Sequence, residues 1–253
     1  LGSDMKNDEI FVSKDSIHIL KHHGSYMQQN RDLKKKAERD KSYQFMLRLK
    51  VPVGEAPAAL YRELDDLSNK YGQGDLRATT RQAFQLHGVL KSNLKQVIAD
   101  IANAGSNTYG GCGDINRNIM APAVYFPNNP AYVHCLKYSK AIADLFKPLT
   151  ESFKELWLDG KPAKIEEYWQ EDIKEFDLDT VRHYDNGRGI ITGHPVEPIY
   201  GRTYLPKKFK IAFTVPGDNS VDLYINDMGC VVVMEPNGID LKGFNIVVGG
   251  GMG

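Results

Sequence analysis

The sequence predicts an α+β protein, with a ferredoxin-like split βαβ half-domain over residues 42–109 and a second mixed α+β region over 110–253. In the first region, apolar residues follow the order strand, helix, strand, strand, helix. In the second, one helical stretch precedes several strand-like runs separated by turn residues. With 253 residues, of which 42% are hydrophobic and 25% charged, the chain resembles globular domains that bury a sizeable core.

The first region begins with an alternating stretch over 44–51, which predicts a strand. A helix follows from Pro57, and its apolar stripe consists of Leu60, Leu64, Leu67 and Tyr71. Gly72 and Gly74 end this helix.

Two further strands are predicted over 76–80 and 83–88, and a short one over 107–109. Between them, Ser92 is expected to cap a second helix. The apolar face of that helix consists of Leu94, Val97, Ile98 and Ile101.

The second region opens with the glycine-rich run 110–114. A helix is predicted over 131–146, ended or kinked by Pro148, and the polar stretch 160–200 is expected to cross the surface. The predicted strands after it cover 207–215, 221–226, 230–234 and 244–248.

The two ends of the chain look different from the rest. Residues 6–40 are polar and include Lys34-Lys35-Lys36, so we expect a tag remnant and a solvated, extended arm over 1–41. The last residues, from Gly249 to Gly253, form a glycine-rich run directly after an apolar stretch. This ending leads us to expect a fragment of a longer protein.

The composition argues against several functions. The 32 basic and 32 acidic residues balance, so the net charge gives no reason to expect nucleic acid or an anionic membrane as a partner. No apolar run approaches the ~18 residues that span a bilayer. Three cysteines without metal-ligand spacing argue against a disulfide framework and a self-contained metal site, and fit a reducing compartment such as the cytoplasm, or the plastid stroma in a photosynthetic eukaryote.

Cations share faces of the predicted strands. If residues 76–81 are extended, Arg77, Thr79 and Arg81 point to one side. Gln85 and His87 do the same on the next strand. Lys208 and Lys210 alternate with apolar neighbours on a later one. Such a face borders either solvent or a bound anion, and the pattern alone leaves both open.

Several runs resemble the assimilatory sulfite reductases, in the order and with nearly the spacing of that family. They are Gln44-Phe45-Met46-Leu47-Arg48, the run from Arg77 to Gly88, Gly113-Asp114-Ile115-Asn116-Arg117-Asn118 and Tyr204-Leu205-Pro206-Lys207-Lys208-Phe209-Lys210. The stretches 215–223 and 243–253 look most like the ferredoxin-dependent branch. The resemblance covers the chain from about Gly24 to its end.

The resemblance implies a sirohaem coupled to a [4Fe–4S] cluster, six-electron reduction of sulfite to sulfide, and ferredoxin as electron donor. By position, Arg77 and Arg81 match arginines that bind sirohaem carboxylates, and Thr79, Gln85 and His87 lie in the same cofactor-contacting run. Four cations match those around the substrate, namely Arg48, Arg117, Lys208 and Lys210. The second region then corresponds to the first part of the sirohaem-binding domain of this fold.

The family's four cluster cysteines lie in a C-terminal half that this chain lacks, and Cys112, Cys135 and Cys230 do not match them. We therefore expect all three cysteines to be ordinary buried residues, the missing half to be a partner, and this portion alone to be inactive. Two alternatives stay open: a ferredoxin-dependent nitrite reductase, and a truncated, non-catalytic fragment that binds an anion. In the nitrite branch the position of Lys210 is typically asparagine, so the two lysines favour sulfite.

Overall fold

The structure is a computed structural model and describes residues 2–29, 42–108, 110–124, 126–149, 157–158, 161–162, 167–184, 192, 194–195 and 197–250. The chain divides into two compact units. Unit 1 comprises Leu1–Lys50, Ala56–Gly113 and Ser152–Glu167, and unit 2 comprises Val51–Glu55, Asp114–Glu151 and Tyr168–Gly253. Each unit combines helices with a sheet, which confirms the predicted α+β class. The predicted division of the chain into the segments 1–41, 42–109 and 110–253 stays a prediction.

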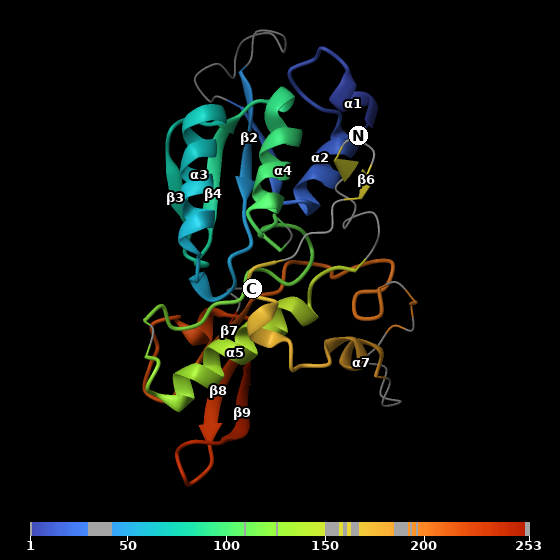
Figure 1. Cartoon of the computed structure of the whole chain (residues 1–253). Helices are drawn as coiled ribbons and strands as arrows, with labels where there is room; N and C mark the ends of the chain where they lie inside the picture. Colours follow the sequence, from blue (N-terminus) through green and yellow to red (C-terminus); the bar gives the residue numbers. More distant parts are fainter. Residues whose placement is uncertain are drawn as a thin grey trace. The chain divides into compact units, whose positions relative to one another are not determined.

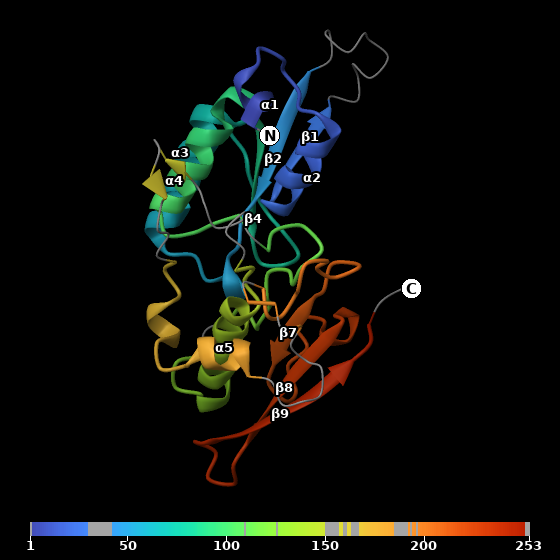
Figure 2. The same cartoon turned by 90° about the vertical axis from the view of Figure 1, so that its right-hand side faces the viewer.

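Unit 1 is built on a four-stranded sheet in the order β1-β2-β4-β3, in which all neighbours are antiparallel (Figures 1 and 2). Its strands are β1 (Ser25–Gln29), β2 (Tyr43–Arg48), β3 (Leu76–Ala78) and β4 (Phe84–Val89). The last three are predicted strands, found with slightly different ends. They provide the frame for six of the predicted site residues.

Two helices, α3 (Ala58–Tyr71) and α4 (Leu94–Asn103), lie side by side over one face of this sheet (Figures 1 and 2). The predicted stripe of α3 is buried, with Leu60 and Leu64 fully so. Burying one such side chain contributes about 1.5–3 kcal/mol. This packing leaves the opposite face of the sheet available for polar residues.

The ends of these helices follow from the glycines and from a short 3-10 turn. The amides of Gly72 and Gly74 both donate to the Ser68 carbonyl, and Gly74 has a φ of +77°, which glycine adopts without strain. The turn η4 (Lys91–Asn93) precedes α4 and moves its N-cap to Asn93. The prediction that Ser92 caps this helix is therefore wrong.

The N-terminal stretch is more ordered than predicted. Its described part forms α1 (Gly2–Lys6), α2 (Lys14–His22) and β1. Every residue of β1 pairs with a residue of β2. The side chains of β1 are mostly polar, so its sequence lacks a strand pattern, and backbone pairing with the edge of β2 makes it a strand. The expectation of an extended arm is wrong for this part, and Lys34-Lys35-Lys36 lie outside the described residues.

Smaller features complete unit 1. The predicted strand at 107–109 is reduced to a single bridge between Asn107 and Lys50, and Tyr109 lies outside the described residues. The short strands β5 (Trp157–Leu158) and β6 (Lys161–Pro162) pair with each other. Within the described ranges, no helix is long and apolar enough to cross a membrane.

Unit 2 has a three-stranded sheet in the order β7-β8-β9, with β7 and β8 parallel and β9 antiparallel to β8. The strands are β7 (Ile211–Thr214), β8 (Met228–Met234) and β9 (Leu241–Val248). The helix α5 (Pro130–Leu145) packs against β7 and β8 (Figures 1 and 2). Its Cys135 joins Ile211, Phe213 and Val232 in the core.

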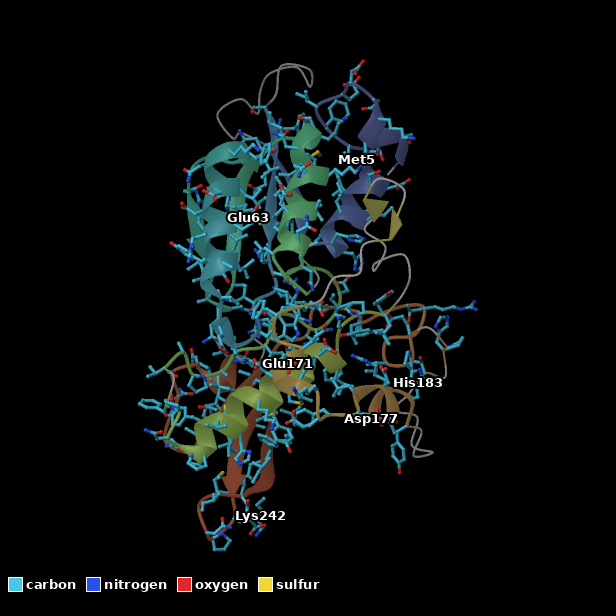
Figure 3. All side chains as sticks on the ribbon, viewed as in Figure 1. Met5, Glu63, Glu171, Asp177, His183 and Lys242 are labelled. Atoms are coloured by element: carbon cyan, nitrogen blue, oxygen red, sulfur yellow. The ribbon has the colours of Figure 1, made fainter. Side chains whose placement is uncertain are left out.

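Three short helical elements contact α5: η3 (Pro52–Gly54), η5 (Glu171–Ile173) and α7 (Leu178–His183). Asp177 caps α7 by accepting from the Thr180 amide at 3.1 Å; Figure 3 labels Asp177 and His183 at the two ends of this helix. Trp169 is fully buried against Ala141 and Ile173. The stretch 160–200 is thus only partly the surface excursion that was predicted.

The predicted strand over 221–226 is wrong. These residues contain the 3-10 turn η6 (Leu223–Ile225), and Asp222 before it has a φ of +51°. The Asn219 side chain accepts from the Leu223 amide at 2.9 Å, so side-chain-to-backbone bonding closes a turn where apolar residues alone suggest a strand.

Candidate functional site

A row of polar side chains crosses the face of the unit 1 sheet opposite α3. Arg48 on β2 pairs with Gln85 on β4, and Gln85 pairs with Arg77 on β3. Residues directly opposite on antiparallel strands point to the same face, and His87 joins them because it lies two positions after Gln85. Four of the predicted site residues thus share one face.

The other face of the same strands is apolar. Leu47 and Leu86 face each other across β2 and β4, and both are fully buried. The ring of Phe84 contacts Tyr61 of α3, with the ring centroids 5.9 Å apart. The core therefore fixes the register that turns Arg48 and Gln85 to the polar side.

Arg48 is held entirely by neutral groups. Its Nη1 donates to the Gly111 carbonyl at 3.3 Å, and its guanidinium lies over the Tyr26 ring, 5.4 Å from the centroid. With the Gln85 amide oxygen toward it, Nε and Nη2 each donate to that oxygen at 2.9 Å. No carboxylate of the described residues pairs with Arg48.

This arrangement leaves the charge of Arg48 available. A guanidinium has five N–H donors, and three of them are used by Gly111 and Gln85, so one remains on each terminal nitrogen. Two remaining N–H donors on a permanent cation suit a carboxylate or an oxyanion.

Two glycines allow the chain to pack closely around Arg48. A Cβ at Gly111 would lie 2.4 Å from the Arg48 carbonyl oxygen, and one at Gly24 would lie 2.7 Å from the same atom. The Gly24 carbonyl accepts from the Arg48 amide at 2.9 Å. Only glycine fits at both positions, so these contacts fix the backbone from which the arginine projects.

The hairpin that carries Arg77, Thr79 and Arg81 differs from the predicted continuous strand. β3 ends at Ala78, and Thr79 begins a turn in which Gln82 has a φ of +53°. The Thr79 amide donates to the Ala83 carbonyl at 2.8 Å and its hydroxyl accepts from the Ala83 amide at 3.2 Å. Strand alternation therefore does not place Arg81 on the face of Arg77, and the Thr79 hydroxyl closes the turn.

Arg77 and Arg81 also differ in their surroundings. The Arg77 side chain is 54% exposed and its Nε lies 2.7 Å from the Asp75 carboxylate. Arg81 is half-buried in the turn. The hairpin thus presents one exposed and one partly enclosed cation.

The surroundings of His87 favour its neutral form. Its Nε2 lies 3.0 Å from the Gln85 amide. Burial lowers the pKa of the imidazole, and the nearby charges of Arg77 and Arg48 lower it further, while Asp75 acts in the opposite direction.

The three predicted cations of unit 2 lie along two segments that run side by side. Asn116 and Phe209 form a parallel bridge, and the Arg117 amide donates to the Phe209 carbonyl at 2.8 Å. Arg117 is therefore adjacent to the residue that separates Lys208 from Lys210. Neither lysine forms an ion pair with a described residue.

These lysines do not lie on a strand, contrary to the prediction. β7 begins at Ile211, and the preceding residues form a bend at 206–207 and an isolated bridge at Phe209. The Lys210 amide donates to the Asp227 carboxylate at 2.7 Å, which anchors the backbone by a side chain. Lys208 is exposed and Lys210 half-buried. Six of the predicted site residues thus belong to unit 1, three belong to unit 2, and each set is assembled within its own unit.

The cysteines do not fit an iron–sulfur cluster. All three are buried, and burial raises the pKa of Cys135 and of Cys230 to about 12. Cys112 forms a short contact with the Tyr26 hydroxyl. A [4Fe–4S] cluster takes four thiolates, more than the three cysteines of this chain, and no cluster of potential metal ligands occurs among the described residues.

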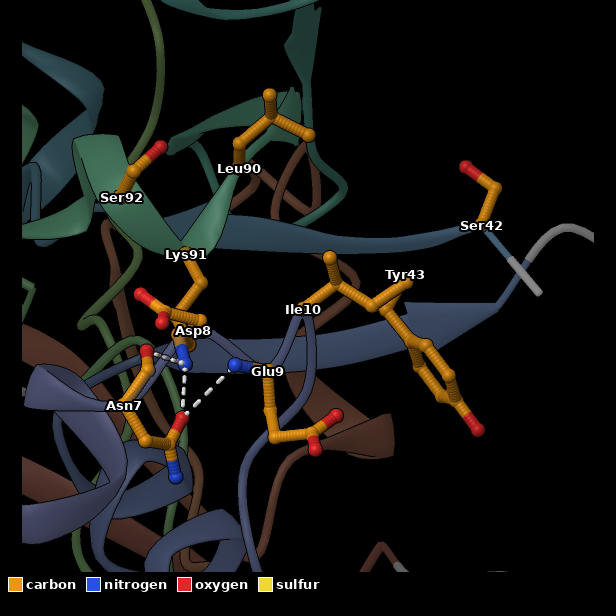
Figure 4. A pocket seen from close by; sticks show the side chains of 9 residues that line it. All are labelled: Asn7, Asp8, Glu9, Ile10, Ser42, Tyr43, Leu90, Lys91 and Ser92. Atoms are coloured by element: carbon orange, nitrogen blue, oxygen red, sulfur yellow. Dashed lines mark hydrogen bonds between the residues drawn. The ribbon is translucent and has the colours of Figure 1, made fainter. Parts of the chain in front are cut away.

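A pocket of about 450 Å³ in unit 1 contains none of the predicted site residues (Figure 4). It lies between residues 7–10, 42–43 and 90–92. Lys91 contributes the cation, but its ammonium group already donates to the Asp4 carbonyl and to two oxygens of Asn7 at 2.7–3.0 Å. With Asp8 and Glu9 also in its wall, this pocket does not suit an anion.

Sequence reasoning missed the neighbours that hold Arg48. Tyr26 lies on β1, which was not predicted, and no local pattern links it to Arg48. Gly111 falls in a glycine-rich run that was noted without a role. A glycine-rich run permits two backbone segments to approach closely, and this is the signal in the sequence that could have pointed to Gly111.

Comparisons with known proteins identify the family of the chain. Residues 36–104 match the nitrite/sulfite reductase ferredoxin-like half domain, and residues 138–253 match the nitrite and sulphite reductase 4Fe-4S domain. The chain is 47% identical over 251 residues to a sulfite reductase (ferredoxin) of Synechococcus elongatus, covering 99% of this chain and 38% of the relative. It is 37% identical over 248 residues to the sulfite reductase (NADPH) hemoprotein beta-component of Bacillus subtilis, covering 96% and 38%.

The solved structure of the Mycobacterium tuberculosis NirA protein shares the fold, with a TM-score of 0.54 and 21% identity over 95% of this chain and 36% of that one. The chain spans about 38% of the length of the curated relatives it matches. Two family models that together cover most of the chain, and relatives that match it over nearly its whole length, show that the chain belongs to the nitrite and sulfite reductase family.

Proposed function

We propose that this chain is the N-terminal portion of an assimilatory sulfite reductase, which reduces sulfite to sulfide with electrons from ferredoxin. The observation that carries the proposal is Arg48, a fixed guanidinium whose partners are all neutral and which keeps two N–H donors for an oxyanion. Lys208 and Lys210 support it, because neither is paired with a carboxylate of the described residues.

Sulfite is favoured over nitrite by charge. Sulfite near neutral pH carries more negative charge than nitrite, so the strongly basic side chains of unit 2, such as Lys208 and Lys210, stabilise it more. Its reduction also releases oxygen as water and so consumes protons, which an ammonium such as that of Lys210 can deliver. The relatives named above are sulfite reductases.

The residues of unit 1 fit a carboxylate-rich prosthetic group. Arg77 and Arg81 project from one exposed hairpin, and cations that are fixed at a surface can neutralise the carboxylates of sirohaem. When bound in the complete protein, sirohaem would supply the redox-active iron for this chemistry, and Arg77 and Arg81 would hold its carboxylates. The cysteine ligands of the [4Fe–4S] cluster must come from outside this chain, because its own three cysteines do not fit the cluster.

Ferredoxin is the proposed donor because the Synechococcus elongatus relative is named for it and is 47% identical, against 37% for the NADPH-dependent Bacillus subtilis relative. The test is steady-state kinetics of the complete protein with sulfite and with nitrite, using reduced ferredoxin and, in parallel, an NADPH-flavoprotein donor. We expect a higher kcat/KM for sulfite than for nitrite, and faster turnover with ferredoxin. A preference for nitrite, or reduction of neither anion, would contradict the proposal.

A further inference from the structure

Gln85 lies between two other predicted site residues and contacts both. Its amide oxygen accepts from Nε and Nη2 of Arg48 at 2.9 Å each, and its amide nitrogen donates to Nε2 of His87 at 3.0 Å. The opposite orientation would set the NH₂ group against two N–H donors of Arg48, with donors facing donors. The network around Gln85 therefore fixes which way the amide points.

The neutral amide matters for Arg48. A carboxylate at this position would accept the same two hydrogen bonds but would also cancel the guanidinium charge by forming a bidentate ion pair. The amide oxygen orients the arginine without that cancellation. The neutral amide is one reason why the charge of Arg48 stays available, although Gly111, Tyr26 and Gln85 all hold the side chain.

The same amide affects His87. Because the Gln85 nitrogen donates to Nε2, that atom must carry a lone pair, so the ring is neutral and its proton is on Nδ1. The charged groups that act on this ring are Arg48, Arg77 and Asp75. Protonation of Nε2 would require the amide to turn, which would remove both acceptor contacts from Arg48.

We propose that Gln85 is a positioning residue that holds Arg48 for an oxyanion without cancelling its charge and keeps His87 neutral. This inference rests on the proposed function, because the oxyanion is taken to be sulfite. It differs from the role expected from the family resemblance, in which Gln85 touches the cofactor. Here it acts through two protein side chains.

The test uses the complete protein and three variants. Gln85→Glu keeps the shape of the side chain and adds a charge, whereas Gln85→Met removes both contacts without adding a charge. Gln73→Glu is the control: it makes the same Gln-to-Glu change at an exposed glutamine that contacts Gln44. Sulfite binding is measured by isothermal titration calorimetry across pH, and the sirohaem content of each sample is recorded as a folding control. Thermal unfolding across pH provides a second readout.

We expect Gln85→Glu to weaken sulfite binding 10-fold or more, Gln85→Met by a smaller factor, and Gln73→Glu by less than two-fold. The added carboxylate also stabilises protonated His87, so in Gln85→Glu the pH dependence of binding and of unfolding shifts to higher pH. A loss in the packing of Gln85 alone would not produce that shift.

The inference is overturned if Gln85→Glu binds sulfite within two-fold of the wild type, if Gln85→Met loses at least as much as Gln85→Glu, or if the pH dependence does not move. Binding and reduction are scored separately in the wild type. A wild type that binds sulfite without reducing it would overturn the proposed function alone. One that does not bind sulfite would overturn both.

Discussion

Arg48→Lys is the substitution that best tests how the site recognises an anion. Arg48 gives three N–H donors to Gln85 and Gly111 and keeps two. A lysine has three donors in all, so if its ammonium keeps two contacts with these neighbours, one donor remains for the anion. The substitution preserves the charge and removes one of two hydrogen bonds.

A hydrogen bond to a charged group contributes about 1.5–3 kcal/mol, and every ~1.4 kcal/mol is a factor of ten. We therefore expect Arg48→Lys to weaken sulfite binding roughly 10- to 140-fold in the complete protein. The assay is the sulfite dissociation constant from calorimetry, together with KM from sulfide formation.

The matched control is Arg62→Lys, the same change at an exposed arginine of α3, which should leave both values within two-fold. Sirohaem content equal to the wild type would show that Arg48→Lys is folded. Sulfite affinity within two-fold of the wild type would refute the argument, because it would mean that charge alone, without the fork of donors, binds the anion.

Three further predictions concern packing, a buried ion pair and anion choice. Leu64→Ala should destabilise unit 1 by about 2–5 kcal/mol in urea unfolding, because Leu64 is fully buried, and a loss below about 1 kcal/mol would contradict the packing described. Arg182→Met should cost about 1.5–3 kcal/mol, since the mostly buried Asp144 carboxylate loses Arg182 at 3.1 Å but keeps Lys147 at 3.5 Å, and an unchanged unfolding midpoint would argue against that pair. Lys210→Asn should lower kcat/KM for sulfite roughly 10-fold or more, which is about 1.4 kcal/mol, and should lower kcat/KM for nitrite less. Equal losses for the two anions would mean that Lys210 supports the cofactor and does not select the substrate.

Local patterns predicted the elements whose own residues show a helix or strand periodicity. The spacing of Leu60, Leu64 and Leu67 places three leucines on one side of a helix, and α3 buries them as predicted. The alternating run before Arg48 likewise gives β2. In these cases local periodicity and tertiary packing agree.

The patterns failed where a distant segment or a side chain decides the structure. β1 is a strand because of the β2 edge, although its own residues are polar. The strand predicted to carry Lys208 and Lys210 starts later, because Asp227 and the bridge to Asn116 hold that segment. The partners of Arg48 on β1 and at Gly111 are far away in sequence, and no spacing rule identifies them.

The most direct measurement of the central claim is the electron stoichiometry of the complete protein with sulfite. Sulfur passes from the oxidation state +4 in sulfite to −2 in sulfide, so the account predicts six one-electron-reduced ferredoxins oxidised per sulfide formed, measured in one anaerobic sample. Oxidation of ferredoxin without sulfide, or sulfite consumption that ends at a partly reduced sulfur product, would contradict it.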